Sequence, residues 1–230
     1  MITRAKGAPV RRQKAGTRGR PLSRERIASA ALALVDREGL AALSFRRLGQ
    51  KLGCEAMSIY HHFASKTHLM DALIDLMLDE IRIPDGRDVP DWVERQRITA
   101  HSFRAMALRH PALFPFFATH RLNTLKGVAF IDGVIGILRD AGFPDGDAAR
   151  YFREIGYYLT GAALDETAGY AKGPSAAEPV SNEVIAARFK HLAAAAPYFQ
   201  PSQYQTTFET GLEILLDGIR RAREKHAAAQ

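Results

Sequence analysis

Apolar residues recur along most of this chain at intervals of three and four positions, which is the spacing of one face of an α-helix. Runs of β-branched residues, which favour strands, are few. Glycine, proline and short polar clusters divide the helical pattern into separate elements. The pattern therefore predicts an all-α fold, in which three short N-terminal helices are joined by a long helix to a larger helical domain.

The first two predicted helices have recognisable ends. Ser23 is expected to cap a helix that reaches about Glu38, with Gly39 just past its end. Ser44 is expected to cap the second helix, in which two leucines lie four positions apart on one face. Gly53 can take the left-handed conformation that ends this helix, because glycine has no Cβ to clash there.

The third helix is predicted to run from about Glu55 to His61. Ile59 and Phe63 would face inward, and a helix with so few apolar anchors is not stable alone in water. Its outward face therefore needs another use. Two short helices joined at a glycine are typical of a helix-turn-helix, whose second helix reads the major groove of DNA, and the alternative is an ordinary hairpin with a solvated face. The residues left facing outward are Ala56, Met57, Ser58, Tyr60 and His61.

The segment that starts at about Ser23 resembles the DNA-binding motif of the TetR family of bacterial repressors. The leucine-glycine turn, the aromatic Tyr60, the His62-Phe63 pair and the later Lys66 all fall at the spacing of that motif. The resemblance implies a helix-turn-helix domain over residues 23–70 that binds double-stranded, palindromic operator DNA. It also implies phosphate contacts at the matching positions Ser44, Ser58, Tyr60, His62 and Lys66.

Fewer residues are expected to read bases. Arg46 is the best candidate for a guanine contact, because its guanidinium can donate twice, to O6 and N7. Ala56 and Met57 offer apolar surface that suits a thymine methyl group, and His61 could reach a base edge or the backbone. Phe45 lies where many relatives in the family have a polar phosphate contact, so that contact is not expected here.

The remaining apolar segments predict a second helical domain over residues 71–230. The helix that enters this domain begins near Ser65, within the first domain, and continues to a stop at Pro84. At about 1.5 Å per residue it is long enough to connect the two domains. A short aromatic element follows Pro111, and Asp145 or Asp147 is expected to cap a helix that reaches about residue 170. Further helices are predicted at about 91–110, 122–141, 183–195 and 202–225, with a loop at 173–182.

Two of the late helices carry wide apolar faces with small residues where helix axes could approach closely. They are the helix at 147–170, with Gly156 and Gly161, and the final helix, with Gly211 and Gly218. The run FETGLEILLDGI is similar to the C-terminal region of tetracycline-repressor-like members of the family, in which this helix pair packs against its symmetry mate. The resemblance implies a homodimer, which suits half-sites about 34–36 Å apart, and an intramolecular core is the alternative.

The second domain is rich in aromatic side chains, which favours a cavity for a small, largely apolar effector, although core packing is the alternative for each residue. Tetracycline-binding relatives hold a ligand-bound magnesium ion through a histidine, and Phe117 stands at the corresponding position. Tetracycline, a bound metal or another cofactor is therefore not expected. The candidate lining residues are Phe103, Met106, Phe114, Phe117, His120, Phe130, Val134, Tyr157, Tyr158 and Thr160.

The net charge of +7 is concentrated at the N-terminus. Residues 1–22 carry seven basic side chains and no acidic one, residues 23–70 carry a net +3, and the remaining residues carry a net −3. Positive charge thus gathers where DNA phosphate is expected. Arg18 and Arg20 flank a glycine in a short run that resembles a minor-groove AT-hook. The alternative is a solubilising leader that attracts DNA without sequence preference. In either case residues 1–22 are expected to form a disordered basic arm, because they include too few apolar residues to fold without a partner.

Composition also bounds the compartment. No apolar segment is long enough to cross a bilayer, and the basic N-terminus lacks the apolar stretch of a secretory signal, so a cytoplasmic protein without membrane contact is expected. The single cysteine, Cys54, cannot form an intrachain disulfide. It is expected to be a small buried residue, with a redox role as the alternative.

These features together predict a ligand-responsive transcriptional regulator, most simply a repressor that a small apolar or aromatic effector releases from its operator. An enzyme is not expected, because the chain has no Walker loop, G-x-S-x-G elbow, H-E-x-x-H pair or Cys/His set at zinc spacing. A ligand-independent architectural DNA binder is the remaining alternative. It would not need a cavity in the second domain.

Overall fold

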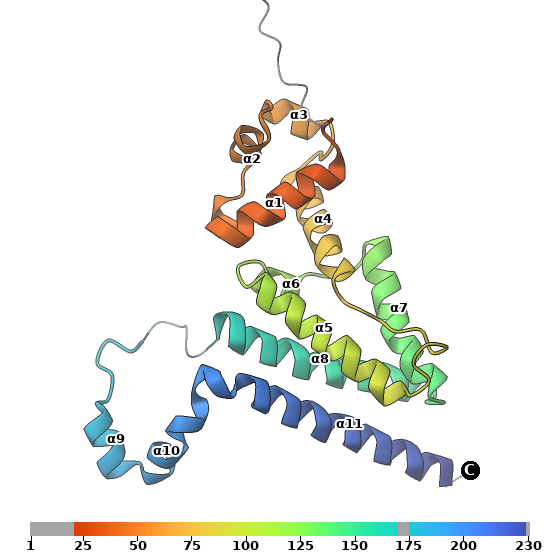
Figure 1. Cartoon of the computed structure of the whole chain (residues 1–230), viewed down its shortest axis with the longest axis vertical. Coiled ribbons are helices and arrows are strands. Elements are labelled where there is room, and N and C mark those ends of the chain that lie inside the picture. The colour runs from red at the N-terminus through yellow and green to blue at the C-terminus, as the bar shows by residue number, and fades with distance from the viewer. Residues whose placement is uncertain (1–20, 170–174, 229–230) are drawn as a thin grey trace, which may run out of the picture.

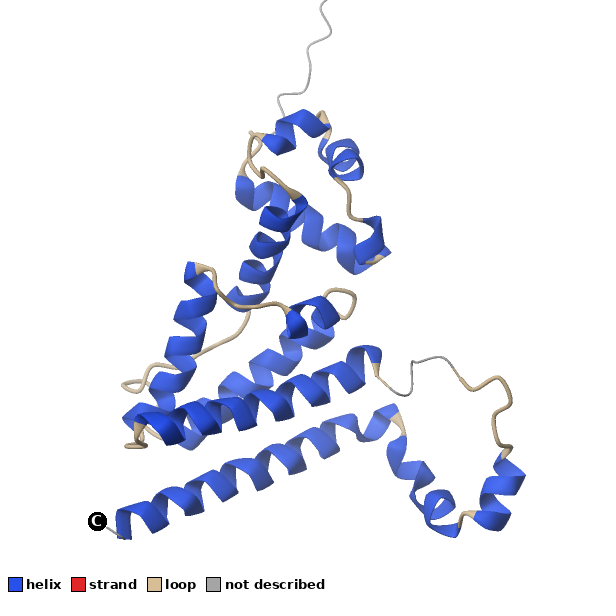
Figure 2. Cartoon of the chain, turned by 180° about the vertical axis from the view of Figure 1, so that it is seen from behind, coloured by secondary structure: helices blue, strands red, loops and turns tan. Residues whose placement is uncertain are grey.

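The computed structural model describes residues 21–169 and 175–228, and all regular structure in these two ranges is helical (Figures 1 and 2). The expected all-α class is therefore confirmed, while Arg18 and Arg20 lie outside the described residues. The α-helices are α1 (Arg24–Glu38), α2 (Phe45–Leu52), α3 (Ala56–Tyr60), α4 (Lys66–Asp79), α5 (Trp92–Arg109), α6 (Phe114–Thr119), α7 (Leu125–Asp140), α8 (Asp145–Ala168), α9 (Asn182–Arg188), α10 (Lys190–Ala195) and α11 (Tyr204–Ala228).

The ends of the first helices are set by the residues that the sequence singled out. The Ser23 hydroxyl accepts a hydrogen bond from Arg26 N at 3.2 Å, and the Ser44 hydroxyl accepts one from Arg47 N at 3.3 Å. Gly53 ends α2 in the left-handed region, at φ 69°. A 3₁₀ turn over Leu40–Ala42 completes the connection from α1 to α2.

The N-terminal helices share one apolar core. Both predicted inward residues of the third segment are fully buried, and the core side chains without exposed surface include Ile27, Val35, Leu48, Ile59, Phe63 and Leu69. These side chains come from α1 to α4, so the start of α4 belongs to the same small domain. In Figure 1, α4 then descends from this group toward α5, α6 and α7.

The connecting helix is shorter than predicted. It ends at Asp79, although the sequence pattern continues to Ile81, which is also buried. Glu80 N and Ile81 N each donate to the carbonyl oxygen three residues earlier, as in a 3₁₀ turn. Arg82 N then donates to Ser102 Oγ on α5 at 3.0 Å. This contact with another helix draws the chain away from the axis of α4 before Pro84 is reached.

The larger domain is built around α5, α7 and α8, with α11 beside α8 along the end of the molecule opposite α1 (Figures 1 and 2). The predicted cap of α8 is wrong. Pro144 occupies the cap position without a side-chain hydrogen bond, and both aspartates lie within the first turn. There they still favour the helix start, because carboxylates stabilise the positive end of the helix dipole.

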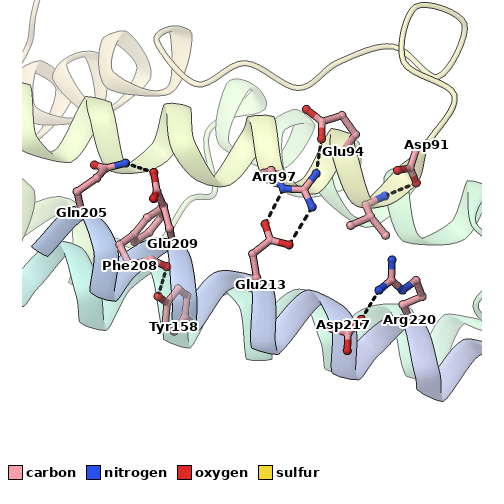
Figure 3. Close-up of polar contacts among 11 residues, drawn as sticks. Asp91, Glu94, Arg97, Tyr158, Gln205, Phe208, Glu209, Glu213, Asp217 and Arg220 are labelled. Atoms are coloured by element: carbon pink, nitrogen blue, oxygen red, sulfur yellow. Dashed lines mark hydrogen bonds and ion pairs between the residues drawn. The ribbon is translucent and has the colours of Figure 1, made fainter.

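The final helix is fastened to α5 and α8 by polar contacts (Figure 3). Arg97 on α5 donates to both carboxylate oxygens of Glu213, at 2.6 and 2.9 Å, and these bonds lower the pKa of Glu213. The Tyr158 hydroxyl on α8 donates to Phe208 O at 2.6 Å, and burial raises its pKa. A buried ion pair between Arg104 and Glu166 lies beside them.

The single helix predicted over 183–195 is two helices, α9 and α10, because Phe189 leaves helical geometry at φ −123° and ψ 64°. In both views this segment stands away from the body of the molecule and returns to the start of α11 (Figures 1 and 2). Within the described part of the chain, no helix is both long enough and apolar enough to cross a membrane.

Candidate nucleic-acid interface and effector cavity

The outward face of α3 carries the residues predicted to meet DNA. Met57 is 62% exposed and Tyr60 is 48% exposed, whereas Ala56 and Ser58 are half-buried. His61 is exposed at the end of the helix, and His62 is half-buried beyond it. A five-residue helix with an exposed methionine and tyrosine presents an apolar and polar surface of the kind that enters a major groove.

The two adjacent arginines at the start of α2 have different surroundings. Both are exposed, but Arg47 forms an ion pair with Glu38 of α1. Arg46 makes no ion pair or hydrogen bond among the described residues, so its guanidinium is available to a base edge or a phosphate.

The phosphate candidates divide between helix caps and free side chains. The Ser44 hydroxyl caps α2. Ser65, which the sequence did not indicate as a phosphate contact, caps α4 in the same way, and its Oγ accepts from His68 N at 3.3 Å. Lys66, the first residue of α4, is exposed, as is the Tyr60 ring. Both side chains are therefore accessible from outside the domain, as a phosphate contact requires.

Three contacts that the sequence did not suggest hold α3 in place. Phe45 packs edge-on against Tyr60, with ring centroids 4.6 Å apart. Phe45 is not expected to bind phosphate itself, but it orients the ring of Tyr60, which is a phosphate candidate. Arg24 lies over the Phe63 ring at 4.2 Å and donates to His62 O. Cys54 is partly buried against the core, and its carbonyl lies close to Gly49.

A cavity of about 170 Å³ lies inside the larger domain, between α5, α6, α7 and α8. Of the predicted lining residues it brings together Phe103, Phe117, His120, Phe130, Val134 and Thr160. The other four lie elsewhere: Met106 and Phe114 are packed fully in the core, Tyr157 is 65% exposed on α8, and Tyr158 faces α11. The sequence reasoning missed the lining residues Gln96, Thr99, Ala118, Leu122, Phe152, Ile155, Gly156 and Leu159.

The cavity wall is mostly apolar, with a few polar groups. Two of these are already used inside the protein, since Thr99 Oγ1 donates to Arg95 O at 2.9 Å and Gln96 Nε2 donates to Val134 O at 3.5 Å. His120 Nε2 is buried and has no hydrogen bond among the described residues, although Asp71 Oδ1 lies 3.1 Å away. His120 and Thr160 are therefore the polar groups best placed to orient a ligand.

The cavity is connected to α4 by a row of aspartates. Asp71, Asp75 and Asp79 lie four residues apart on one face of α4. They contact, in order, His120 at 3.1 Å, the Thr124 hydroxyl at 2.7 Å and the ammonium group of Lys126. The segment from the cavity wall to the start of α7 is thus tied to the helix that carries the N-terminal domain. No group of three or more potential metal ligands occurs in the described ranges.

Both the N-terminal helix-turn-helix domain and the larger domain match models of known protein families. Residues 27–73 match the family model described as bacterial regulatory proteins of the tetR family. Residues 85–223 match the model described as the tetracyclin repressor-like C-terminal domain.

Individual relatives agree with the family models. The tetracycline repressor protein class A from transposon 1721 of Escherichia coli is 30% identical over 200 residues, which cover 86% of this chain and 90% of the relative. A possible TetR family regulator from Streptomyces coelicolor A3(2) is 34% identical, with a TM-score of 0.71 over 87% of this chain and 100% of that one. ActR from Streptomyces coelicolor, solved in complex with actinorhodin, is 28% identical, with a TM-score of 0.71 over 89% of this chain and 99% of its own. The chain therefore belongs to the TetR family of bacterial regulatory proteins and is a ligand-responsive, DNA-binding repressor.

Proposed function

We propose that this repressor works as a homodimer and that a small, largely apolar or aromatic effector, held without a metal ion, releases it from its operator. The observation that carries this proposal is the cavity, which is lined by aromatic and aliphatic side chains and linked through His120 and Asp71 to α4. A cavity of this kind gains affinity by burying apolar ligand surface, at about 25 cal/mol per Å².

The size of the cavity bears on the mechanism. At about 170 Å³ it is smaller than the pockets of roughly 300–1,000 Å³ that hold most drug-sized ligands. An effector larger than a single ring must therefore push its walls apart. The complex of the relative ActR with actinorhodin supports a small-molecule effector for this chain.

The wall that moves is proposed to be the segment from His120 to Lys126, because its contacts with α4 transmit any displacement to the reading helices. A shift of α4 changes the distance between the two α3 helices of a dimer. These helices then no longer fit successive major grooves, which lie about 34–36 Å apart. By linkage, the operator weakens effector binding by the same factor, about 5–150-fold.

Dimerisation is proposed to use α8 and α11. Their outer face leaves a groove of about 460 Å³ lined by Tyr157, Gly161 and Gly211 among others, and it exposes 70% of Ile214. Large apolar side chains exposed beside small residues favour close helix packing with a second copy.

A library of apolar and aromatic compounds, screened by thermal shift and by release of operator DNA, tests the effector class. An inducer is expected to work equally with and without a chelator. Phe117→Trp should fill part of the cavity and block induction while operator binding is retained, because Phe117 lines the cavity and lies on α6, which is well separated from α3 (Figure 1). Tyr151→Trp enlarges an α8 residue outside the cavity lining and serves as the matched control. A chelator-sensitive inducer, or a normal response of Phe117→Trp, would show the proposed site to be wrong.

A further inference from the structure

A buried histidine lies where the two domains meet. His110 caps the C-terminal end of α5 and is 4% exposed. Its Nδ1 lies 3.0 Å from both carboxylate oxygens of Asp36 on α1, and its Nε2 lies 2.9 Å from Glu80 Oε1. Glu80 is the cap residue of α4. The His110 imidazole of the larger domain therefore contacts both α1 and the end of α4, which belong to or lead from the helix-turn-helix domain.

The chemistry of imidazole limits how these contacts can form. A neutral ring carries one N–H and one lone pair, whereas the imidazolium ion carries two N–H groups. Ionised carboxylates only accept hydrogen bonds. Since both ring nitrogens of His110 face carboxylate oxygens, all of these contacts are attractive only when the ring is protonated. A neutral ring would leave a lone pair against one carboxylate.

The surrounding charges favour the same conclusion. Besides Asp36 and Glu80, the charged group at the junction is Arg109, which pairs with the second oxygen of Glu80. The six residues of α6, which follows His110, include no titratable side chain. Two carboxylates and two cations balance when His110 is charged, and a net negative charge remains around the buried ring when it is neutral.

We infer that His110 is a proton-dependent clamp. As an imidazolium it holds Asp36 of α1 and Glu80 of α4 against the end of α5, and so it fixes the orientation of the DNA-binding domain relative to the larger domain. The clamp is complete at low pH and is lost as the pH rises and the ring loses its proton. Its consequence for DNA rests on the proposed function: the clamped arrangement is the one that matches the operator, so operator affinity includes a contribution that falls with rising pH.

The clamp itself can be tested without DNA or effector. The full-length protein is labelled with ¹⁵N at histidine and studied by NMR. The spectrum of the His110 ring is expected to show that both ring nitrogens carry a proton near neutral pH. Its signals are assigned by their disappearance in His110→Gln. Spectra are recorded from about pH 6 to 9, on both sides of neutrality. A ring that carries a single proton throughout this range overturns the inference.

Operator affinity over the same pH range tests the consequence. His110→Gln should weaken binding by about fivefold or more while the wild-type ring is protonated, and its effect should shrink as the pH rises and the wild-type ring loses its proton. His61 and His62, near the expected DNA surface, are present in both wild type and His110→Gln. Any effect that they have on operator affinity therefore cancels in the ratio of the two affinities. Asp36→Asn, which removes one charge but keeps a side chain of the same shape, should show the same convergence.

Asp79→Asn is the matched control, because it breaks an exposed contact between α4 and Lys126 of α7 that involves no histidine. Its ratio to wild type should not change with pH. If His110→Gln weakens binding by a constant factor at every pH, the residue is only structural and the clamp is wrong. If no operator is bound at any pH, the proposed function fails, and the ring spectrum still decides whether His110 is doubly protonated.

Discussion

Two adjacent arginines at the start of α2 make different contacts. Arg47 is held by Glu38, and this contact stabilises the approach of α2 to α1. Arg46 is exposed and makes no ion pair with the described residues, so it keeps all five donors for DNA. The distinction follows from the helix positions of the two residues, since neighbours on a helix point about 100° apart and only one of them faces α1.

Arg46→Ala should cost about 1–3 kcal/mol in operator binding and relax the preference at one base pair, because a bidentate contact to guanine is lost. Arg47→Ala removes the same charge beside it without changing that preference. Lys66→Ala should weaken all sequences nearly equally, as expected for a phosphate contact. Binding of each variant to a panel of single-base operator variants measures this. An unchanged preference profile for Arg46→Ala would mean that Arg46 does not read a base.

The effector cavity shows how far single residues could be predicted from the sequence. An aromatic-rich domain was evident, and Phe103 and Phe117 do line the cavity. Met106 and Phe114 are equally apolar and lie nearby in sequence, yet they are buried in the core. Hydrophobic periodicity separates buried from exposed positions, but α5 is apolar on more than one face and cannot indicate which face lines a void.

The turn between α2 and α3 depends on close backbone approach. A Cβ added at Gly49 would lie 2.7 Å from Cys54 O and 3.3 Å from Ala56 N, both of which are backbone atoms that cannot rotate away. Gly49 therefore allows α3 to pack against α2, whereas Gly53 provides the left-handed turn. The sequence identified Gly53 by its position after the helix, but nothing local distinguished Gly49 from any other helical glycine.

Gly49→Ala should destabilise the N-terminal domain by about 1–3 kcal/mol, as overpacking does, and should weaken operator binding because α3 is displaced. Gly136→Ala is the matched control. It makes the same change in α7, where nothing lies within 4 Å of the added Cβ, and should stabilise by up to about 1 kcal/mol through helix propensity. Urea unfolding of both variants decides the matter, and equal stabilities would contradict the steric argument.

The length of α4 shows where element prediction fails. Apolar spacing alone extends the helix to Ile81, and the core does bury that residue. The helix nevertheless ends at Asp79, since Arg82 N bonds to Ser102, which lies 20 residues further along the chain. Local signals such as Ser23, Ser44 and Gly53 could be read from the sequence because each acts within one turn. A tertiary hydrogen bond has no local signal.

At the scale of the whole molecule, the outer face of α8 and α11 should decide the oligomeric state. Ile214→Lys places a charge where Ile214 is 70% exposed in the single chain but would be buried in a dimer. The variant should remain folded, sediment as a monomer and bind the operator weakly. Leu125→Lys, at a site on α7 that is 91% exposed, is the matched control and should stay dimeric. A dimeric Ile214→Lys would place the interface elsewhere.

The distribution of charge gives the last prediction. The seven uncompensated basic residues before Leu22 precede in sequence the domain whose α3 is expected to meet DNA, while the larger domain carries a small net negative charge. This separation favours DNA contact at one end of the molecule and leaves the effector domain with little attraction to phosphate. Contacts of Arg18 and Arg20 with DNA would release counterions whether these residues enter a minor groove or only neutralise the backbone.

Deleting residues 2–20 should therefore weaken operator binding and make the slope of log affinity against log salt shallower by several units, at about 0.9 per neutralised phosphate. Dimerisation should survive, because α8 and α11 are untouched. Comparing operators with A·T-rich and G·C-rich flanks then separates the two roles of the arm. A loss confined to A·T-rich flanks indicates minor-groove reading, and an equal loss on both indicates general attraction. A salt slope that does not change on deletion would show that the arm makes no contact with DNA.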